Sequence, residues 1–364
     1  MSHDPVVIVN GARTPMGGFQ GNLSSVTATT LGAISIREAL KRAGVQPEQV
    51  QEVIMGCVLP AGLKQGPARQ AALEAGIPAA AGATTVNKLC GSGMKATMLA
   101  HDLIKAGTND IMVAGGMESM SNAPYILPKA RGGYRMGHGQ IMDHMFLDGL
   151  EDARTGRLMG SFAQDMATTL GLGRADMDAF AVESLRRANA AIANGDFKAE
   201  IVAVPVSTRK GEVLVDTDEQ PGNANPEKIP TLKPAFAKDG TITAANASSI
   251  SDGASALVLM KESKARELGL QPLARIVGHS TQSQDPSEFT IAPIGAFATL
   301  FAKTGWSADS VDLFEINEAF AMVTMAAMMK HNIPHDKVNV YGGACALGHP
   351  VGSTGSRIVL TLIH

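Results

Sequence analysis

Cys90 is the residue whose position in this chain points most clearly to chemistry. It follows a β-rich run, Thr84–Leu89, and precedes a glycine turn, Gly91–Gly93, which leads into a helix-compatible stretch, Met94–Ala106. A cysteine at such a junction lies at a helix N-terminus, where free backbone N–H groups and the helix dipole favour an anion. Because these conditions lower the pKa of a thiol, we expect Cys90 to be a nucleophile. A small buried core cysteine is the alternative.

Two further segments carry side chains suited to catalysis. A second glycine turn, residues 342–355, contains His349. A histidine inside such a turn is positioned by backbone, and its imidazole can carry a proton near neutral pH or donate to a developing oxyanion. Asn317 opens the segment Asn317–Ala321 after an expected strand. A buried asparagine can orient a water or a carbonyl, although asparagine at this position is also a common helix cap.

The composition is that of a soluble globular chain with room for two or three domains. Of the 364 residues, 45% are hydrophobic and 18% charged, and the net charge is −3. Lys and Arg form no cluster and no apolar run is long enough to span a bilayer, so we expect neither nucleic acid nor membrane as a partner. Three widely spaced cysteines favour a reducing compartment. The first nine residues do not resemble a secretory signal, so we expect a cytoplasmic enzyme.

The apolar pattern alternates between strands and helices, which is typical of an α/β fold. Before residue 117 we expect strands at Val6–Val9, Val53–Leu59, Thr84–Leu89 and Ile111–Ala114, and helices at Leu31–Ala43, Ala68–Ala75 and from Met94 to about Gly107. From 117 to about 250 the pattern loosens, and we interpret this stretch as a large insertion with helices at Phe162–Leu170 and Asp176–Ala193. A strand at Ala254–Met260 then restores the alternation.

The chain also contains an internal repeat. Segments of the second half echo segments of the first: Leu273–Val277 echoes Val6–Val9, Ser310–Glu315 echoes Gln49–Ile54, and Val338–Asn339 echoes Val86–Asn87. We therefore expect two similar halves that pack together with their glycine turns meeting at one site. In the second half, the helix from Ser356 runs directly to His364, and no counterpart of the strand Ile111–Ala114 follows.

Taken together, these segments resemble the thiolase family over nearly the whole chain and in the family's order. The matching blocks are Arg13–Pro15, the nucleophile motif Val86–Ala96, Gly115–Ser121, Asn246–Ser248, Asn317–Ala321, and Gly348–Pro350 with Gly352 and Gly355. The resemblance implies an α/β, five-layered αβαβα fold of two duplicated halves with an inserted loop domain that binds coenzyme A. We expect the first half at residues 1–118 plus 250–270, the loop domain at 119–249, and the second half at 271–364.

The resemblance also implies a reaction. Cys90 takes an acyl group as a thioester, while His349 activates that cysteine and, with a water held by Asn317, polarises the thioester carbonyl. The Cys90 backbone N–H helps to form a second oxyanion site. The reaction is the reversible Claisen condensation of two acetyl-CoA molecules, or CoA-dependent cleavage of a 3-ketoacyl-CoA, in fatty acid metabolism. A thioester intermediate divides carbon–carbon bond making into two easier steps.

For coenzyme A itself, the resemblance implies contacts from a mostly apolar set: Leu150, Met159, Phe236, Ala244, Ser248, Ala319 and Phe320. Coenzyme A and acyl-CoA are expected as substrates, with no permanently bound cofactor. No His, Cys, Asp or Glu spacing predicts a metal site. Many thiolases have a histidine just before the methionine that corresponds to Met159, and Leu158 fills that position here. Some contacts to the pantetheine are therefore expected to be apolar or water-mediated.

Another departure concerns a second catalytic cysteine, which the family carries in a C-terminal glycine turn and which this sequence does not reach. We expect the 364-residue chain to accept an acetyl group on Cys90 but not to condense it, and we expect Cys345 to have a packing role instead. Two alternatives remain open. One is an enzyme similar to 3-ketoacyl-carrier-protein synthases, and the other is a non-catalytic acyl-CoA- or lipid-binding protein on the same scaffold. The resemblance further implies a homo-oligomer, a tetramer built from tight dimers.

Overall fold

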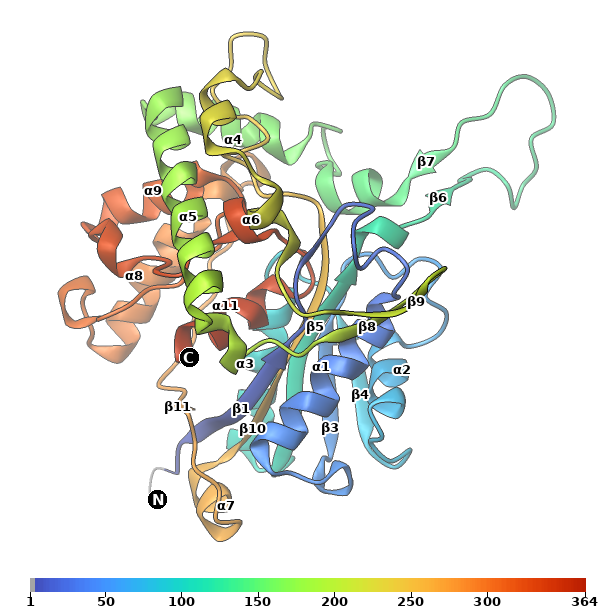
Figure 1. The fold of residues 1–364 in the computed structure, drawn as a ribbon, viewed down its shortest axis with the longest axis vertical. Helices are drawn as coiled ribbons and strands as arrows, with labels where there is room; N and C mark the ends of the chain where they lie inside the picture. The colour runs from blue at the N-terminus through green and yellow to red at the C-terminus, as the bar shows by residue number, and fades with distance from the viewer. Residues whose placement is uncertain (1–3) are drawn as a thin grey trace.

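The computed structural model describes residues 4–364, which are built around a seven-stranded mixed sheet (Figure 1). The strand order is β11-β1-β10-β5-β3-β4, and the short β2 pairs with β10. The strands are β1 (Val6–Arg13), β2 (Gly17–Gly18), β3 (Glu52–Gly56), β4 (Gly82–Val86), β5 (Ile111–Ser119), β10 (Ser251–Lys261) and β11 (Ala274–Arg275). The strands expected in the first half are confirmed with shifted ends, and residues 251–261 join that half's sheet.

Burial explains why the central strands are nearly continuous apolar runs. All of β5 and almost all of β1 and β10 are buried, because helices cover both faces of the sheet. Strand β10 pairs antiparallel with β1 and β5, whereas β3 runs parallel to β5 and β4. Along β1, Val7 and Val9 face one apolar cluster and Val6 and Ile8 face another, which is the period of two that a pleated strand requires.

Two pairs of helices form the layers on either side of this sheet. Helices α1 (Ala28–Ala43) and α2 (Pro67–Glu74) cover one face, and α3 (Ser92–Ala106) and α11 (Thr354–Ile363) cover the other. Helix α11 belongs to the second half, yet its Leu360 packs with Ala96 and Ala100 of α3 in one core. The two halves are therefore joined through α3 and α11, the helices that follow the two glycine turns.

The second half is mainly helical. Its helices are α8 (Ala292–Thr304), α9 (Ala321–His331), α10 (Ala344–Leu347) and α11. Of its three expected strands, only Ala274–Arg275 pairs in the sheet, and Phe314 and Val338 form a single parallel bridge. The repeat indicated strands in all three segments, and the structure has one only in the first, shortened to two residues. A strand needs continuous hydrogen-bonding neighbours, and the segments around Phe314 and Val338 are held instead by an apolar cluster that they form with α8 and α9.

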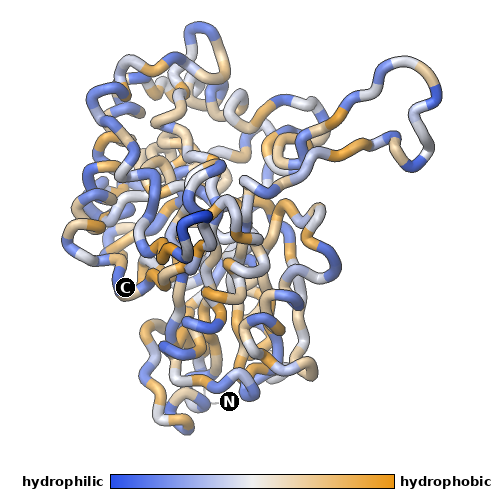
Figure 2. The backbone as a smooth tube through the Cα atoms, turned by 45° about the vertical axis from the view of Figure 1, so that its right-hand side comes forward, coloured by the Kyte–Doolittle hydropathy of each residue, from blue (hydrophilic) through white to orange (hydrophobic). Residues whose placement is uncertain are grey.

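The expected insertion contains helices α4 (Met159–Thr169), α5 (Arg174–Asn194) and α6 (Glu219–Asn223), and two hairpins, β6–β7 (Tyr125–Ile126, Met142–Asp143) and β8–β9 (Val204–Thr208, Gly211–Val215). Residues 125–143 form an arm that extends well away from the body, with apolar segments among polar ones (Figure 2). Helix α7 (Glu262–Glu267) follows β10, and the π-helical turn η3 (Phe146–Leu150) and single turns at 47–49, 120–122, 196–199, 226–231, 286–291, 308–310 and 335–337 complete the chain. No helix among residues 4–364 combines the length and apolar character needed to cross a membrane.

Candidate active site

Cys90 lies in a tight turn between β4 and α3 that fastens itself with local hydrogen bonds. The Ser92 hydroxyl accepts from the backbone N–H of Lys88 (2.8 Å) and donates to the carbonyl of Leu89 (2.6 Å). Leu89 has a left-handed backbone with φ of 48°, a conformation that costs a branched side chain free energy. The turn leaves Cys90 exposed, which excludes the core-cysteine alternative.

The expected lowering of the Cys90 pKa is wrong. Although the residue reaches the surface, the protein around the sulfur desolvates the thiolate and, together with the charge of Glu118, raises the pKa of Cys90 to about 11. The helix begins only at Ser92, with Gly91 as its N-cap, so the helix dipole does not overcome this desolvation. The Cys90 thiol is therefore protonated at neutral pH and needs a base before it can act as a nucleophile.

The two glycine turns of the halves interlock, as the repeat predicted. A side-chain carbon at Gly93 would lie 2.6 Å from the Ser356 hydroxyl, and one at Gly355 would lie 2.4 Å from the backbone nitrogen of Met94. Distances this short leave no room for any side chain, so the two backbones meet only because both positions are glycine. This contact brings the first turns of α3 and α11 together and places the turns of Cys90 and His349 on one side of the sheet.

His349 is buried, and its hydrogen bonds define which ring nitrogen is basic. Its Nδ1 lies 2.6 Å from the hydroxyl of Thr354, which itself donates to the carbonyl of Pro350 (3.1 Å). Because that hydroxyl proton is engaged, Nδ1 carries the proton and donates to Thr354, which leaves the lone pair on Nε2. Burial and the nearby charge of Arg357 lower the pKa of His349 to about 3, so the imidazole is neutral.

Asn317 lies beside that lone pair. Its side-chain nitrogen, Nδ2, lies 3.4 Å from Nε2 of His349, in the position of a donor. Its side-chain oxygen, Oδ1, is buried and accepts no hydrogen bond from residues 4–364. A buried acceptor of this kind needs a donor, and a water or a substrate group can supply it. The structure thus brings His349 and Asn317 together.

Two buried glutamates that sequence reasoning did not single out hold the turn of His349. On one side, Glu318 accepts from Asn339 (2.8 Å), from the Ser184 hydroxyl of α5 (2.8 Å) and from the backbone of Cys345 (3.0 Å). Burial raises its pKa. Cys345 is half-buried and its thiol donates to the Glu318 carbonyl at 3.6 Å, which agrees with a packing role.

On the other side, Glu118 at the end of β5 accepts three backbone N–H groups. These come from Val58 (2.9 Å) and Leu59 (3.0 Å) of the first half and from Gly352 (2.9 Å) of the second. Burial raises the pKa of Glu118 to about 7. The Cys57 thiol donates to the same carboxylate at 3.7 Å and is buried, as expected. The motif blocks contained both glutamates, and a carboxylate inside an otherwise apolar block was the signal that could have found them.

The residues expected to contact coenzyme A fall into three places. Phe236 packs edge-to-face on Phe320 with ring centroids 6.3 Å apart, and Ser248 donates through its hydroxyl to the carbonyl of Ala319 (3.0 Å). The ring of Phe236 also lies against Gly160, next to Met159 at the start of α4. Leu150 lies in a different apolar cluster with Val58, Val351 and Ile250, and Ala244 is exposed.

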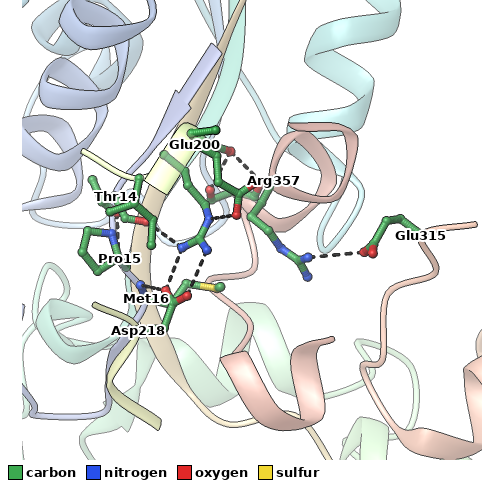
Figure 3. Close-up of polar contacts among 12 residues, drawn as sticks. Thr14, Pro15, Met16, Glu200, Asp218, Glu315 and Arg357 are labelled. Atoms are coloured by element: carbon green, nitrogen blue, oxygen red, sulfur yellow. Dashed lines mark hydrogen bonds and ion pairs between the residues drawn. The ribbon is translucent and has the colours of Figure 1, made fainter. Parts of the chain in front are cut away.

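Buried arginines tie the insertion and the second half to this region. Arg13 of β1 forms ion pairs with Glu200 (2.6 Å) and Asp218 (2.7 Å) of the insertion. Arg357 of α11 reaches toward Glu315 at 3.5 Å, and two of its nitrogens have no partner among residues 4–364 (Figure 3). The charge of Arg357 therefore remains poorly compensated, which is why it disfavours a second positive charge on His349.

Comparison with known proteins identifies this architecture. Residues 6–263 match the family model described as thiolase, N-terminal domain, and residues 270–364 match thiolase, C-terminal domain. The chain is 48% identical to an acetyl-CoA acetyltransferase of Pseudomonas aeruginosa over 99% of this chain and 92% of that protein. It is 51% identical to acetyl-CoA acetyltransferase 2 of Arabidopsis thaliana over 98% of this chain and 90% of that protein.

A solved structure agrees with these sequence relatives. The Acat5 thiolase from Ascaris suum, crystallised in complex with coenzyme A, superimposes with a TM-score of 0.94 at 41% identity, over 99% of this chain and 93% of that one. The expected thiolase fold is confirmed by this likeness. Since both family models together span almost the whole chain, the protein belongs to the thiolase family.

Proposed function

We propose that this protein is an acetyl-CoA C-acetyltransferase that works through an acetyl group carried on Cys90. In one direction, two acetyl-CoA molecules give acetoacetyl-CoA and coenzyme A, and in the other, coenzyme A cleaves a 3-ketoacyl-CoA. The observation that carries the proposal is the contact between the two glycine turns. It brings the turn of the exposed Cys90 thiol to the turn of the neutral His349 imidazole, which lies beside Asn317, an amide whose oxygen has no partner among residues 4–364. The names of the relatives support the same substrate.

The first step is proton transfer from Cys90 to His349. The thiol holds its proton at neutral pH, and the only lone pair on the His349 ring is on Nε2. Attack of sulfur on the thioester carbonyl forms the new S–C bond as the proton moves to Nε2, and coenzyme A leaves with that proton as its thiol. Because the pKa of Cys90 is raised to about 11 and that of His349 is lowered to about 3, the proton moves to Nε2 only as the S–C bond forms, and it then passes to the leaving sulfur.

The second contribution is stabilisation of the charge that develops on the carbonyl oxygen. The side-chain nitrogen of Asn317 lies against His349, and its side-chain oxygen has no partner among residues 4–364. That oxygen can accept from a water, which in turn can donate to the substrate carbonyl. The backbone N–H of Cys90 is a second donor near the reacting sulfur. The acetyl group then passes from Cys90 to the α-carbon of a second acetyl-CoA. An α C–H bond and the S–C bond to Cys90 break as the C–C bond forms, and the released proton returns the Cys90 sulfur to its thiol form.

For coenzyme A, we propose that residues 119–249 form the loop domain between halves at 1–118 plus 250–270 and at 271–364. The cluster of Phe236, Phe320, Ala319 and Ser248 at the start of α4 is the favoured contact for the pantetheine, with Met159 beside it. Leu150 then lines the side near Val351 and His349. Ala244, which is exposed, would contact coenzyme A at the entrance.

We further propose that the chain assembles in the cytoplasm as a homotetramer built from two dimers, and acts in fatty acid metabolism. Strand β4 is the edge of the sheet, and the turn after it is exposed, which leaves a strand edge free for a second copy. The arm 125–143 exposes Tyr125, Met136 and Ile141, which suits a second contact between copies. Three free thiols suit a reducing compartment.

Mass spectrometry of the intact protein before and after mixing with acetyl-CoA tests the proposal. One acetyl increment is expected, and it should be absent from the Cys90→Ala variant. An increment that persists in Cys90→Ala, or no increment on a folded chain, would contradict acyl transfer through Cys90. The Cys345→Ala variant is the matched control, because its half-buried thiol is expected to remain unmodified and its loss should leave acetylation of Cys90 unchanged.

A further inference from the structure

Helix α3 and the segment after β11 bring together three side chains with metal-binding atoms. Oδ1 of Asp102 lies 2.9 Å from Nδ1 of His101 and 2.9 Å from Nε2 of His279. The three ligand atoms all lie within 4.8 Å of one another, and the two imidazole rings meet edge to face. We propose that His101, Asp102 and His279 bind a divalent transition-metal ion of the zinc class.

The spacing of the ligand atoms needs only a small adjustment. Zinc binds imidazole nitrogen at about 2.0–2.1 Å and carboxylate oxygen at about 2.0–2.2 Å in a tetrahedral arrangement, which places ligand atoms roughly 3.3 Å apart. Asp102 is more than half exposed and can turn to open the two 2.9 Å contacts. The ion would replace the two ring protons that now point at one carboxylate oxygen, and water would take its fourth position.

The donor set and the surrounding charge select the kind of ion. Two imidazoles and one carboxylate suit Zn²⁺, Co²⁺ or Ni²⁺, whereas Ca²⁺ and Mg²⁺ prefer several oxygens. Lys105 lies close enough to act on His101, and the Lys303 ammonium donates to the carbonyl of His279 at 3.1 Å. These two positive charges disfavour ions such as Ca²⁺ and Mg²⁺, which bind mainly through electrostatic attraction to oxygens. Binding therefore depends on the two imidazole nitrogens.

The site also joins the two halves of the molecule. His101 is buried on α3, the helix that follows Cys90, while His279 comes from the second half, a few residues beyond β11. One fixed ligand and two more accessible ones form a site that an ion can enter from solvent. Because the bound ion would link the halves only in the folded state, it should raise the thermal stability of the chain.

Calorimetric titration with ZnCl₂ after chelator treatment tests this proposal, together with the visible absorption of bound Co²⁺. Both are done in the Cys90→Ala background, so that the exposed thiol does not compete. We expect one ion per chain, the absorption bands of tetrahedral Co²⁺ without a sulfur charge-transfer band, and a higher melting temperature with Zn²⁺. Binding should weaken by more than about 10-fold in His279→Ala and in Asp102→Ala. Removing a residue that only supports a metal ligand already lowers metal affinity by about 10-fold, and removing a ligand should cost at least as much.

Two comparisons decide the outcome. His138→Ala removes an exposed histidine of the arm and should leave the affinity unchanged. Neither His279 nor Asp102 is fully buried, so both test variants should fold, which a melting curve without metal would check. No binding by the parent protein, or binding that is equally strong in His279→Ala, would overturn the proposal. The three side chains would then be only a hydrogen-bonded contact between the halves.

Discussion

The turns that carry Cys90 and His349 are related by the internal repeat, yet they are held in opposite ways. The Cys90 turn is fastened by neighbours within a few residues, such as Ser92, and is exposed. The His349 turn is buried and fastened by groups far along the chain, with Glu118 on one side and Glu318 on the other. The proposed nucleophile, Cys90, is thus reachable by a substrate, while the proposed base, His349, is fixed by the whole fold.

This contrast separates chemistry from stability. Apart from those of the buried Ser92 hydroxyl, hydrogen bonds of the exposed residues 87–90 contribute little to global stability, since water replaces them readily. Buried carboxylates that accept several N–H groups are different, because loss of one partner leaves donors without acceptors inside the protein. Substitutions in the first turn should therefore change activity with little change in stability, and substitutions at the glutamates should lower stability first.

The largest effect is expected from Cys90→Ala. The rate of acetyl transfer from acetyl-CoA to the protein should fall by roughly 10³-fold or more, because the covalent intermediate cannot form. The melting temperature should stay close to that of the parent, since the side chain is exposed. A time course of acetylation and a melting curve check both parts, and a variant that loses several degrees would contradict the local character of this turn.

A large loss of stability is expected from Glu318→Gln. The side-chain NH₂ of glutamine would face at least one of the donors Ser184, Asn339 and Cys345, whichever way the amide is turned. Unfolding free energy should fall by about 3 to 4 kcal/mol, because a buried donor loses its acceptor and a second hydrogen bond weakens. Urea unfolding measures this. The control is Glu183→Gln on the same helix, where the side chain is half-buried and pairs with Arg186 and Arg187, and a smaller loss of about 1 kcal/mol is expected.

Part of this comparison follows from sequence and part does not. The repeat correctly predicted that the turns of Cys90 and His349 meet, because matching strand–turn–helix units pack in matching ways. It did not reveal Glu118 and Glu318, whose partners lie up to 234 positions away. The predicted lowering of the Cys90 pKa was also wrong, because the local sequence pattern shows where the helix starts but not how the surrounding protein desolvates the thiolate. His279 escaped notice because 177 positions separate it from Asp102.

A pH-dependent effect of similar size is expected at Glu118. Its pKa is about 7 in the folded chain against 4.5 ordinarily, so the folded state favours the protonated carboxyl. The stabilisation from that proton is fully present below pH 4.5, declines as pH rises toward 7, and is lost above it, a span of roughly 3 kcal/mol. From pH 4.5 to 8, the unfolding free energy of the parent should fall relative to that of Glu118→Gln by roughly 3 kcal/mol. Parallel curves would contradict it.

The smallest effect is expected from Leu89→Gly, which tests whether the exposed turn stores strain. Leu89 has a φ of 48°, and glycine adopts this conformation without penalty. The gain is offset by the greater freedom of glycine in the unfolded chain, so unfolding free energy should change by less than about 1 kcal/mol. Gly348→Ala makes the reverse change in the buried turn, where φ is 103° and the new carbon would lie 2.4 Å from the Ser251 hydroxyl. Gly348→Ala should be the more destabilising of the two, and equal losses in urea unfolding would show that the turns are held alike.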